Sequence, residues 1–140
     1  MIRMLALLGA FFFTAISAHA SHFRGGSLTW KKLASPANTV EVTVTESWAV
    51  SPGNTYNWGD GTGSFNTTTG AGAVVIASGT DATGPFIVVR KVINHTYSGP
   101  GPWTITSSSC CRIGALVNAS NAYWRLDSVV TCATATRVRR

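Results

Sequence analysis

Cysteine and histidine are the side chains of this sequence best suited to covalent or metal chemistry. The chain has three cysteines, an adjacent pair and a distant third, at Cys110, Cys111 and Cys132. With His95 they could bind Zn²⁺, but paired zinc ligands are normally separated by two to four residues. A catalytic cysteine assisted by His22 or His95 has no recognisable motif around it. We therefore expect a disulfide rather than a metal site or a nucleophile.

Strand geometry limits how these cysteines can pair. Successive side chains of a strand point to opposite faces, so only one of Cys110 and Cys111 can easily face Cys132. We expect that one to bond Cys132, with the other left buried or paired outside the chain. A bond between Cys110 and Cys111 themselves stays open as an alternative, although it needs a distorted local backbone.

The five carboxylates of the chain form no recognisable catalytic group. They are Glu41, Glu46, Asp60, Asp81 and Asp127. A glycosidase needs two carboxylates that converge on one bond, whereas Glu41 and Glu46 lie on opposite faces of one expected strand. The motifs of serine hydrolases, zinc proteases and phosphate-binding loops do not occur in the sequence. We predict that the chain is not an enzyme.

Asp60 lies between Gly59 and Gly61, in a turn where a carboxylate could contribute to a Ca²⁺ site. Calcium takes six to eight oxygen ligands, and no cluster of carboxylates surrounds Asp60 in the sequence. We favour a carboxylate that caps its own turn, keep Ca²⁺ as the weaker interpretation, and expect no other cofactor.

Arg112, Trp124 and Arg125 are candidate ligand contacts, because they combine planar donor groups with apolar neighbours in the sequence. A structural ion pair between an arginine and Asp127 is the favoured alternative. The tryptophans could form a stacking platform for sugars if two of them were exposed. We expect at least three of the five to lie in the core: Trp30, Trp48, Trp58, Trp103 and Trp124.

The charge distribution argues against a nucleic-acid partner. The 140 residues include 11 Lys+Arg and 5 Asp+Glu, a formal net charge of +6, yet only 11% of residues are charged. One positive charge, Arg3, lies in an apolar N-terminal segment, and Arg137, Arg139 and Arg140 end the chain. The remaining domain is nearly neutral, whereas nucleic-acid binding needs a basic stripe on a folded face.

The elements that must position these residues are strands. Along residues 39–50, Val40, Val42, Val44 and Trp48 fall on one face, and Glu46 interrupts that face, which we expect to mark an edge or a bend. Further strands are predicted over residues 27–33, 73–78, 86–96, 103–108 and 123–131, with a flexible loop over 66–72. Turns rich in Gly, Pro and Asp separate them. This pattern predicts an all-β fold, a single antiparallel β-sandwich.

The N-terminus predicts a secreted protein. Residues 1–20 combine a basic residue, an apolar run and an A-H-A cleavage pattern, as secretory signal peptides do, and the run is shorter than the ~20 residues of a membrane span. We expect a β-sandwich domain over residues 21–132, a disordered basic tail over 133–140 and no membrane span after cleavage. Possible N-glycosylation sites are Asn66, Asn94 and Asn118.

Two segments resemble the polycystic-kidney-disease type repeat, an immunoglobulin-like β-sandwich of secreted and cell-surface proteins. Residues 56–62 read Y-N-W-G-D-G-T, and residues 94–106 read N-H-T-Y-S-G-P-G-P-W-T-I-T. They are similar to a turn and a strand of that repeat. The resemblance implies one turn and core motif in which the histidine packs and hydrogen-bonds: Trp58, Gly59, Asp60, Gly61, His95 and Tyr97.

A second resemblance spans more of the chain. S-H-F-R-G-G from residue 21, C-C-R-I from residue 110 and Y-W-R-L from residue 123 are together similar to an N-terminal module of large extracellular proteins, which often continue into adhesion-type repeats. The resemblance implies a surface location and adhesion. We predict a secreted or cell-surface structural or adhesive module with an extracellular protein or glycan as partner. The alternatives are a carbohydrate-binding module that uses exposed tryptophans and a fragment of a secreted hydrolase.

Overall fold

The computed structural model describes residues 23–49, 53–113 and 122–133. The predictions for the signal peptide, His22, Asn118 and the arginines of the tail fall outside these ranges. Within them the chain forms eight strands and one short 3-10 helix. Their bounds are β1 (Phe23–Lys32), β2 (Thr39–Trp48), β3 (Thr55–Asn57), β4 (Ser64–Asn66), η1 (Thr69–Ala71), β5 (Val74–Asp81), β6 (Gly84–Thr96), β7 (Trp103–Ser109) and β8 (Trp124–Val130).

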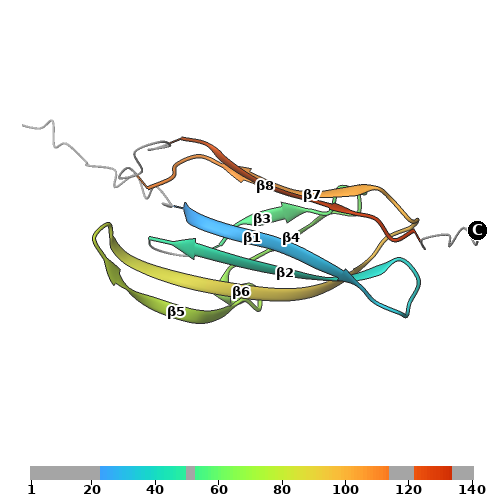
Figure 1. The fold of residues 1–140 in the computed structure, drawn as a ribbon, viewed down its shortest axis with the longest axis horizontal. Helices are drawn as coiled ribbons and strands as arrows, with labels where there is room; N and C mark the ends of the chain where they lie inside the picture. Colours follow the sequence, from blue (N-terminus) through green and yellow to red (C-terminus); the bar gives the residue numbers. More distant parts are fainter. Residues whose placement is uncertain (1–22, 50–52, 114–121, 134–140) are drawn as a thin grey trace, which may run out of the picture.

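The strands form two four-stranded antiparallel sheets that pack as a sandwich (Figure 1). The first sheet has the order β1-β2-β6-β5 and the second has the order β4-β3-β7-β8. This arrangement confirms the predicted all-β fold and its antiparallel sandwich.

The alternation along β2 explains how the first sheet packs on the second. Val40, Val42, Val44 and Trp48 are at most 1% exposed, while Glu41, Thr43, Thr45 and Ser47 are partly exposed on the other face. Full burial of such a side chain contributes about 1.5–3 kcal/mol. The spacing of the valines therefore decides which face of the sheet turns inward.

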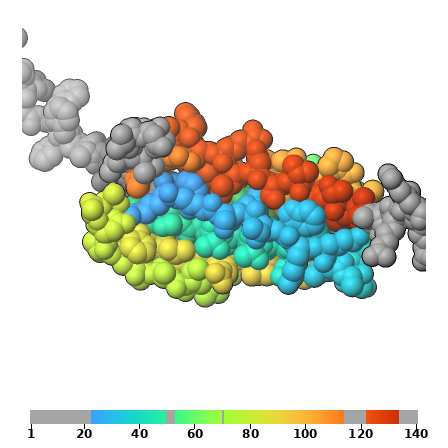
Figure 2. Space-filling view, viewed as in Figure 1, coloured from blue at the N-terminus to red at the C-terminus, as the bar shows by residue number. Residues whose placement is uncertain are grey.

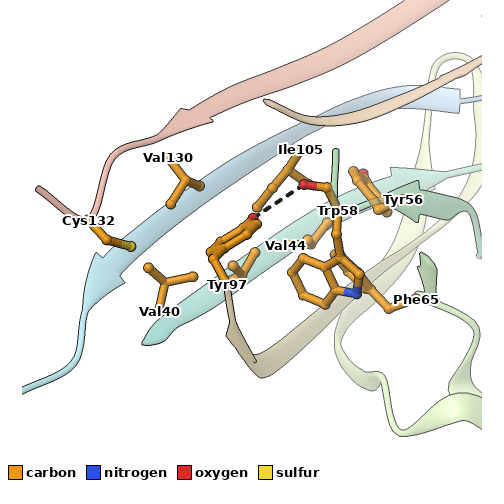
Figure 3. Packing of buried hydrophobic residues seen from close by; sticks show 10 residues of the cluster. Val40, Val44, Tyr56, Trp58, Phe65, Tyr97, Ile105, Val130 and Cys132 are labelled. Atoms are coloured by element: carbon orange, nitrogen blue, oxygen red, sulfur yellow. Dashed lines mark hydrogen bonds between the residues drawn. The ribbon is translucent and has the colours of Figure 1, made fainter. Parts of the chain in front are cut away.

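Aromatic side chains from both sheets fill the centre of the sandwich (Figure 3). Trp58 packs on Phe65 at a centroid distance of 4.3 Å, and Tyr56 stacks on Phe65 at 5.2 Å. The hydroxyl of Tyr97 donates to the carbonyl of Trp58, which joins β6 to the turn after β3. A second cluster of Phe23, Trp48 and Trp124 lies nearer one end, with Phe23 stacked 3.9 Å from Trp124.

One expectation about local structure, that for Glu46, was wrong. The segment 66–72, predicted as a flexible loop, begins with the last residue of β4, contains the 3-10 turn η1 and leads to β5. Glu46 lies in the interior of the sheet, paired with Gly26 of β1 and Val89 of β6, rather than at an edge or a bend. Its side chain is fully buried because donors from three other residues surround it: Trp48, Tyr56 and Thr67.

The two ends of the sandwich differ in what they hold. One end contains the start of β1, the end of β2, the β5–β6 turn, the end of β7 and the start of β8. We call it the disulfide end, because a disulfide between Cys110 and Cys111 directly follows β7. The opposite end contains the β1–β2 and β6–β7 connections. The described chain therefore starts at the disulfide end with Phe23 and ends at the opposite end with Ala133 (Figure 1).

Candidate functional site

The structure brings together the two segments that resemble a polycystic-kidney-disease type repeat. His95 stacks on Trp58 at 4.1 Å with an interplanar angle of 7°, and its Nε2 lies 2.8 Å from Oδ2 of Asp60. Tyr97 meets the His95 ring edge-on at 4.5 Å. His95 packs between two aromatic rings and hydrogen-bonds a carboxylate, so its geometry is that of a structural residue.

Asp60 caps its own turn. Its Oδ1 accepts hydrogen bonds from the backbone amide and the hydroxyl of Thr62, at 3.0 and 2.7 Å. Burial raises the pKa of Asp60, but the hydrogen bonds from His95 and Thr62 outweigh it and lower the pKa to about 2. Both oxygens already have protein donors, and in the ranges that the structure describes no group of three His, Cys, Asp or Glu side chains could hold a metal ion.

Gly59 and Gly61 serve this turn in different ways. Both have a positive φ, of 83° and 82°, which favours glycine. A Cβ on Gly59 would also lie 2.2 Å from the carbonyl oxygen of Thr104, whereas one on Gly61 would meet nothing within 4 Å. The turn therefore needs glycine at residue 59 for packing as well as for conformation.

The cysteines pair differently from the main prediction. Cys110 and Cys111 bond each other, and Cys132 is a free, buried thiol. The hairpin register explains the difference: Ser109 pairs with Trp124, whereas Trp103 pairs with Val130. Cys110 thus lies at the disulfide end and Cys132 at the opposite end, where its amide donates to the carbonyl of Pro100. The seven-residue ladder of β7 and β8 lies between them, and at about 3.3 Å per residue a bond from Cys110 to Cys132 is out of reach.

Of the three candidate ligand contacts, Arg125 forms the expected ion pair. Its Nε lies 2.7 Å from Oδ2 of Asp127, whose other oxygen accepts from Thr106. The hydrogen bonds from Thr106 and Arg125 lower the pKa of Asp127. Arg112 follows the disulfide and forms an isolated bridge with Phe23 instead of pairing with Asp127. Trp124 is buried at 3% exposure, so it is not a surface contact.

The tryptophans do not form a sugar platform. Trp48, Trp58 and Trp124 are buried and Trp30 and Trp103 are half-buried, so none of the five is exposed. This removes the feature on which the carbohydrate-binding alternative depended. Of the sequons in the described ranges, Asn94 is exposed on β6, while the side-chain amide of Asn66 donates to Thr55.

All five carboxylates of the chain lie in the described ranges, and each has a partner inside the domain. The three aspartates contact basic side chains: Asp60 contacts His95, Asp81 contacts Arg24 and Asp127 contacts Arg125. Glu46 is buried among three hydrogen-bond donors, and Glu41 forms an exposed pair with Lys31 at 2.8 Å.

One hollow of the described surface lies on the outer face of the first sheet, toward the disulfide end. It has a volume of about 390 Å³ and is lined by Arg24, Gly25, Ser47, Asp81, Thr83, Phe86 and Ile113. A second hollow, of about 280 Å³, shares Gly25 and Ser47 and extends past Gly26, Ser27, Thr45 and Val88. We call the two adjoining hollows the outer trough. Figure 2 shows the surfaces of β1, β2, β6 and the β5–β6 hairpin beside one another on this side of the molecule.

Arg24 builds one end of the outer trough. It is the extra residue of a bulge in β1, and its guanidinium donates to Asp81 at 2.5 Å and to the carbonyls of Gly84 and Pro85 at 3.0 and 2.9 Å. It also lies over the ring of Phe86, 5.5 Å from the centroid. The side chain is only 9% exposed. Arg24 thus ties the start of β1 to the β5–β6 turn and closes the end of the trough.

Asp81 carries the exposed charge of this end. Hydrogen bonds from Thr83, followed by the bond and the charge of Arg24, lower its pKa, so the carboxylate is ionised at neutral pH. The opposite charges of Arg24 and Asp81 are in contact, so the outer trough has no net charge from this pair. The sequence interpretation missed the trough, although an Arg-Gly-Gly run inside a strand was a signal for it.

No helix of the described ranges is long and apolar enough to cross a membrane.

The comparisons with known proteins give one family. The model of the N-terminal domain of integrin beta-like proteins A–E matches residues 24–133, well over half of the chain. No curated protein and no solved structure matches the chain. The matched span begins at Arg24, which closes the outer trough, and ends at the last described residue, so it coincides with the folded sandwich. The chain belongs to the family of the integrin beta-like protein A–E N-terminal domain.

Proposed function

We propose that the chain is a secreted or cell-surface adhesion module that binds a protein partner and catalyses no reaction. The observation that carries this proposal is the match to the N-terminal domain of integrin beta-like proteins over the whole sandwich, because that family suggests an extracellular or adhesion-type module and is not a known catalytic family. The engagement of all five carboxylates inside the domain supports the non-catalytic part.

A protein partner is favoured over a glycan by the burial of the tryptophans. Sugar-binding sites commonly present an aromatic face to the ring, and here all five tryptophans are buried or half-buried. Tyr123 is the one large aromatic side chain of the described ranges that is widely exposed, at 83%. A single ring gives no stacked platform.

The test is an adhesion assay with the secreted chain. Beads coated with it are placed on living cells of the organism that makes it, on cells shaved with protease and on cells stripped of glycans. We expect adhesion to untreated and glycan-stripped cells and its loss after protease treatment. Adhesion that survives protease and disappears with the glycans contradicts the proposal. Turnover of generic ester or glycoside substrates by the purified chain contradicts the non-catalytic part.

A further inference from the structure

We propose that the bond between Cys110 and Cys111 is a reversible redox site, which a dithiol reduces while the domain stays folded, and that its reduction releases Arg112 from the start of β1. The inference is independent of the proposed adhesion. Three features carry it: a bond that closes a very short ring, a backbone conformation that the bond imposes, and a ladder that is displaced by one residue beyond the bond.

The bond contributes little to the stability of the whole domain. A disulfide stabilises a fold mainly by restricting the unfolded chain, and this effect grows with the length of the loop that the disulfide closes. Cys110 and Cys111 are adjacent in the sequence, so the unfolded chain loses little freedom when they are joined. We therefore expect the sandwich to stay folded after reduction, and the role of the bond is local.

The local effect of the bond is on the backbone at Cys111. Side chains of adjacent residues in a strand point to opposite faces, so neighbouring cysteines can join only where the chain leaves the strand. β7 ends at Ser109, and Cys111 has a φ of 80°, in the left-handed region that non-glycine residues rarely adopt. The other described non-glycine residue with a positive φ is Asn38, a residue type that tolerates it. Once the bond is opened, Cys111 is free to return to an extended conformation.

The bond also lies where the pairing between β7 and β8 changes register. Ser109 pairs with Trp124, and a ladder that continued unchanged would place Cys111 opposite Ala122. Instead, the amide of Arg112 donates to the carbonyl of Ala122 at 3.2 Å. The β7 side therefore contains one extra residue, as in a β-bulge, and the two bonded cysteines accommodate it.

The displaced register decides which way Arg112 and Ile113 face. It places Arg112 beside Phe23 in an isolated parallel bridge and leaves Ile113 buried at 8% exposure. A shift of one residue turns each side chain to the opposite face. In a ladder that continued from Ser109 without the extra residue, Arg112 and Ile113 would lose these positions, and the start of β1 would lose its bridge.

Exposure leaves the bond open to attack by a thiol. Cys110 is exposed and Cys111 is half-buried, and exposed disulfides are typically the labile or regulatory ones. A thiolate of the dithiol attacks the sulfur of Cys110, which forms a mixed disulfide and releases Cys111 as a thiolate that takes up a proton. The second thiol of the dithiol then attacks the mixed disulfide and releases Cys110 as a thiol. Two electrons and two protons pass to the cysteines, and the dithiol becomes a disulfide.

Cys132 does not compete in this exchange. It is 2% exposed and lies at the opposite end of the β7–β8 hairpin. The chain has three cysteines in all, so a thiol formed at Cys110 has Cys111 as the cysteine of its own chain within reach. The same bond therefore re-forms when the reduced domain is oxidised.

The first arm of the test treats the full chain with dithiothreitol under native conditions and labels free thiols with iodoacetamide. We expect two labels per chain, on Cys110 and Cys111, with Cys132 labelled only after unfolding. Trypsin cuts after Arg112 and Arg125, so it separates Cys132 from the other two cysteines for mass spectrometry. The unfolding temperature of the reduced chain is expected to stay close to that of the oxidised chain.

The second arm compares amide hydrogen exchange in the oxidised and reduced chains by NMR. The amide of Arg112 is expected to exchange about tenfold faster or more after reduction, because its bond to Ala122 opens. The amides at the start of β1 are expected to follow. Those in the middle of β2 and β6 are the internal control and stay unchanged. Oxidised glutathione is expected to restore the slow exchange.

Two double variants separate the bond from the backbone conformation. Cys110→Ala with Cys111→Ala lacks the bond and is expected to exchange like the reduced chain, with or without dithiothreitol. Cys110→Ala with Cys111→Gly also lacks the bond, but glycine adopts a positive φ readily, so this variant is expected to keep part of the protection at Arg112. Cys132→Ala is the control for the third thiol and is expected to respond to reduction as wild type does.

Three results would overturn the inference. A bond that dithiothreitol opens only in the unfolded chain is no redox site of the native domain. A large fall in the unfolding temperature on reduction makes the bond a stabilising element of the whole fold. Unchanged exchange at Arg112 after reduction, or equal protection there in the two double variants, removes the link between the bond and the start of β1.

Discussion

Replacing Glu46 by glutamine tests how the two sheets are joined. The Glu46 carboxylate on β2 accepts from the hydroxyl of Tyr56 at 2.5 Å, from Thr67 at 2.6 Å and from Nε1 of Trp48 at 3.2 Å. All four side chains are at most 1% exposed. Tyr56 and Thr67 belong to the part of the chain that forms the second sheet and its turn, so one carboxylate connects both layers.

The magnitude follows from the three hydrogen bonds. A hydrogen bond to a charged acceptor contributes about 1.5–3 kcal/mol, against about 0.5–1.5 kcal/mol for a neutral one. Glutamine keeps one acceptor oxygen and brings an NH₂ group against buried donors. We therefore expect Glu46→Gln to lower the free energy of unfolding by about 3 kcal/mol, at about 1 kcal/mol for each bond. For a domain of this size the melting temperature falls by roughly 13 °C.

The assay is thermal and denaturant unfolding followed by tryptophan fluorescence, and Glu41→Gln is the control. Glu41 lies on the outer face of the same strand, where its pair with Lys31 is exposed and contributes at most about 1 kcal/mol. A loss below about 1 kcal/mol for Glu46→Gln, or one equal to that of Glu41→Gln, refutes the reasoning.

Three further predictions use the same measurements or simple chemistry. Gly59→Ala is expected to lower the free energy of unfolding by about 3 kcal/mol or more, because the new Cβ would lie 2.2 Å from the carbonyl oxygen of Thr104. The control Gly61→Ala is expected to lower it by about 1–2 kcal/mol, for its positive φ alone. Similar losses for the two variants would contradict the packing role of Gly59. Thiol labelling is expected to modify one cysteine per chain, and only after unfolding, because Cys132 is 2% exposed and Cys110 is bonded to Cys111. A disulfide-linked peptide in a digest that joins Cys132 to Cys110 or Cys111 would disprove this pairing. Asp60, with its pKa lowered from 3.8 to about 2, contributes stability that is present above pH 4 and lost as the pH falls toward 2, so Asp60→Asn should flatten the acid limb of an unfolding titration.

Much of the fold followed from the sequence because alternation and turn residues are local signals. The long strands, such as β2 and β6, contain enough alternating apolar residues to be recognised. The short strands β3 and β4 were not predicted, because each has only three residues and one buried aromatic side chain, Tyr56 in β3 and Phe65 in β4. Their strand character comes from pairing with neighbours rather than from their own pattern.

The features that sequence reasoning missed depend on contacts across the fold. The cysteine pairing depends on which end of the β7–β8 hairpin each cysteine occupies. The sequence argument considered only which face of a strand each side chain points to, and not its position along the hairpin. Glu46 looked like an interruption because its three donors are distributed over other segments. The outer trough is formed by an absent side chain at Gly25 and by residues from four separate parts of the chain. The short motif of Trp58, Asp60 and His95 was recognisable because a known repeat places the same residue types together.

The placement of the first and last described residues of the sandwich, Phe23 and Ala133, has a mechanical consequence. β1 and β8 both run from the disulfide end to the opposite end, and they touch where Nε1 of Trp30 donates to the carbonyl of Val129 and Nζ of Lys32 to that of Cys132. A pull that separates Phe23 from Ala133 therefore draws these two strands past each other along their length. The hydrogen bonds of the β1–β2 and β7–β8 ladders lie across that direction, so they share the tension and fail together in shear rather than one at a time by unzipping. Such a domain transmits force between its ends with little extension before it ruptures.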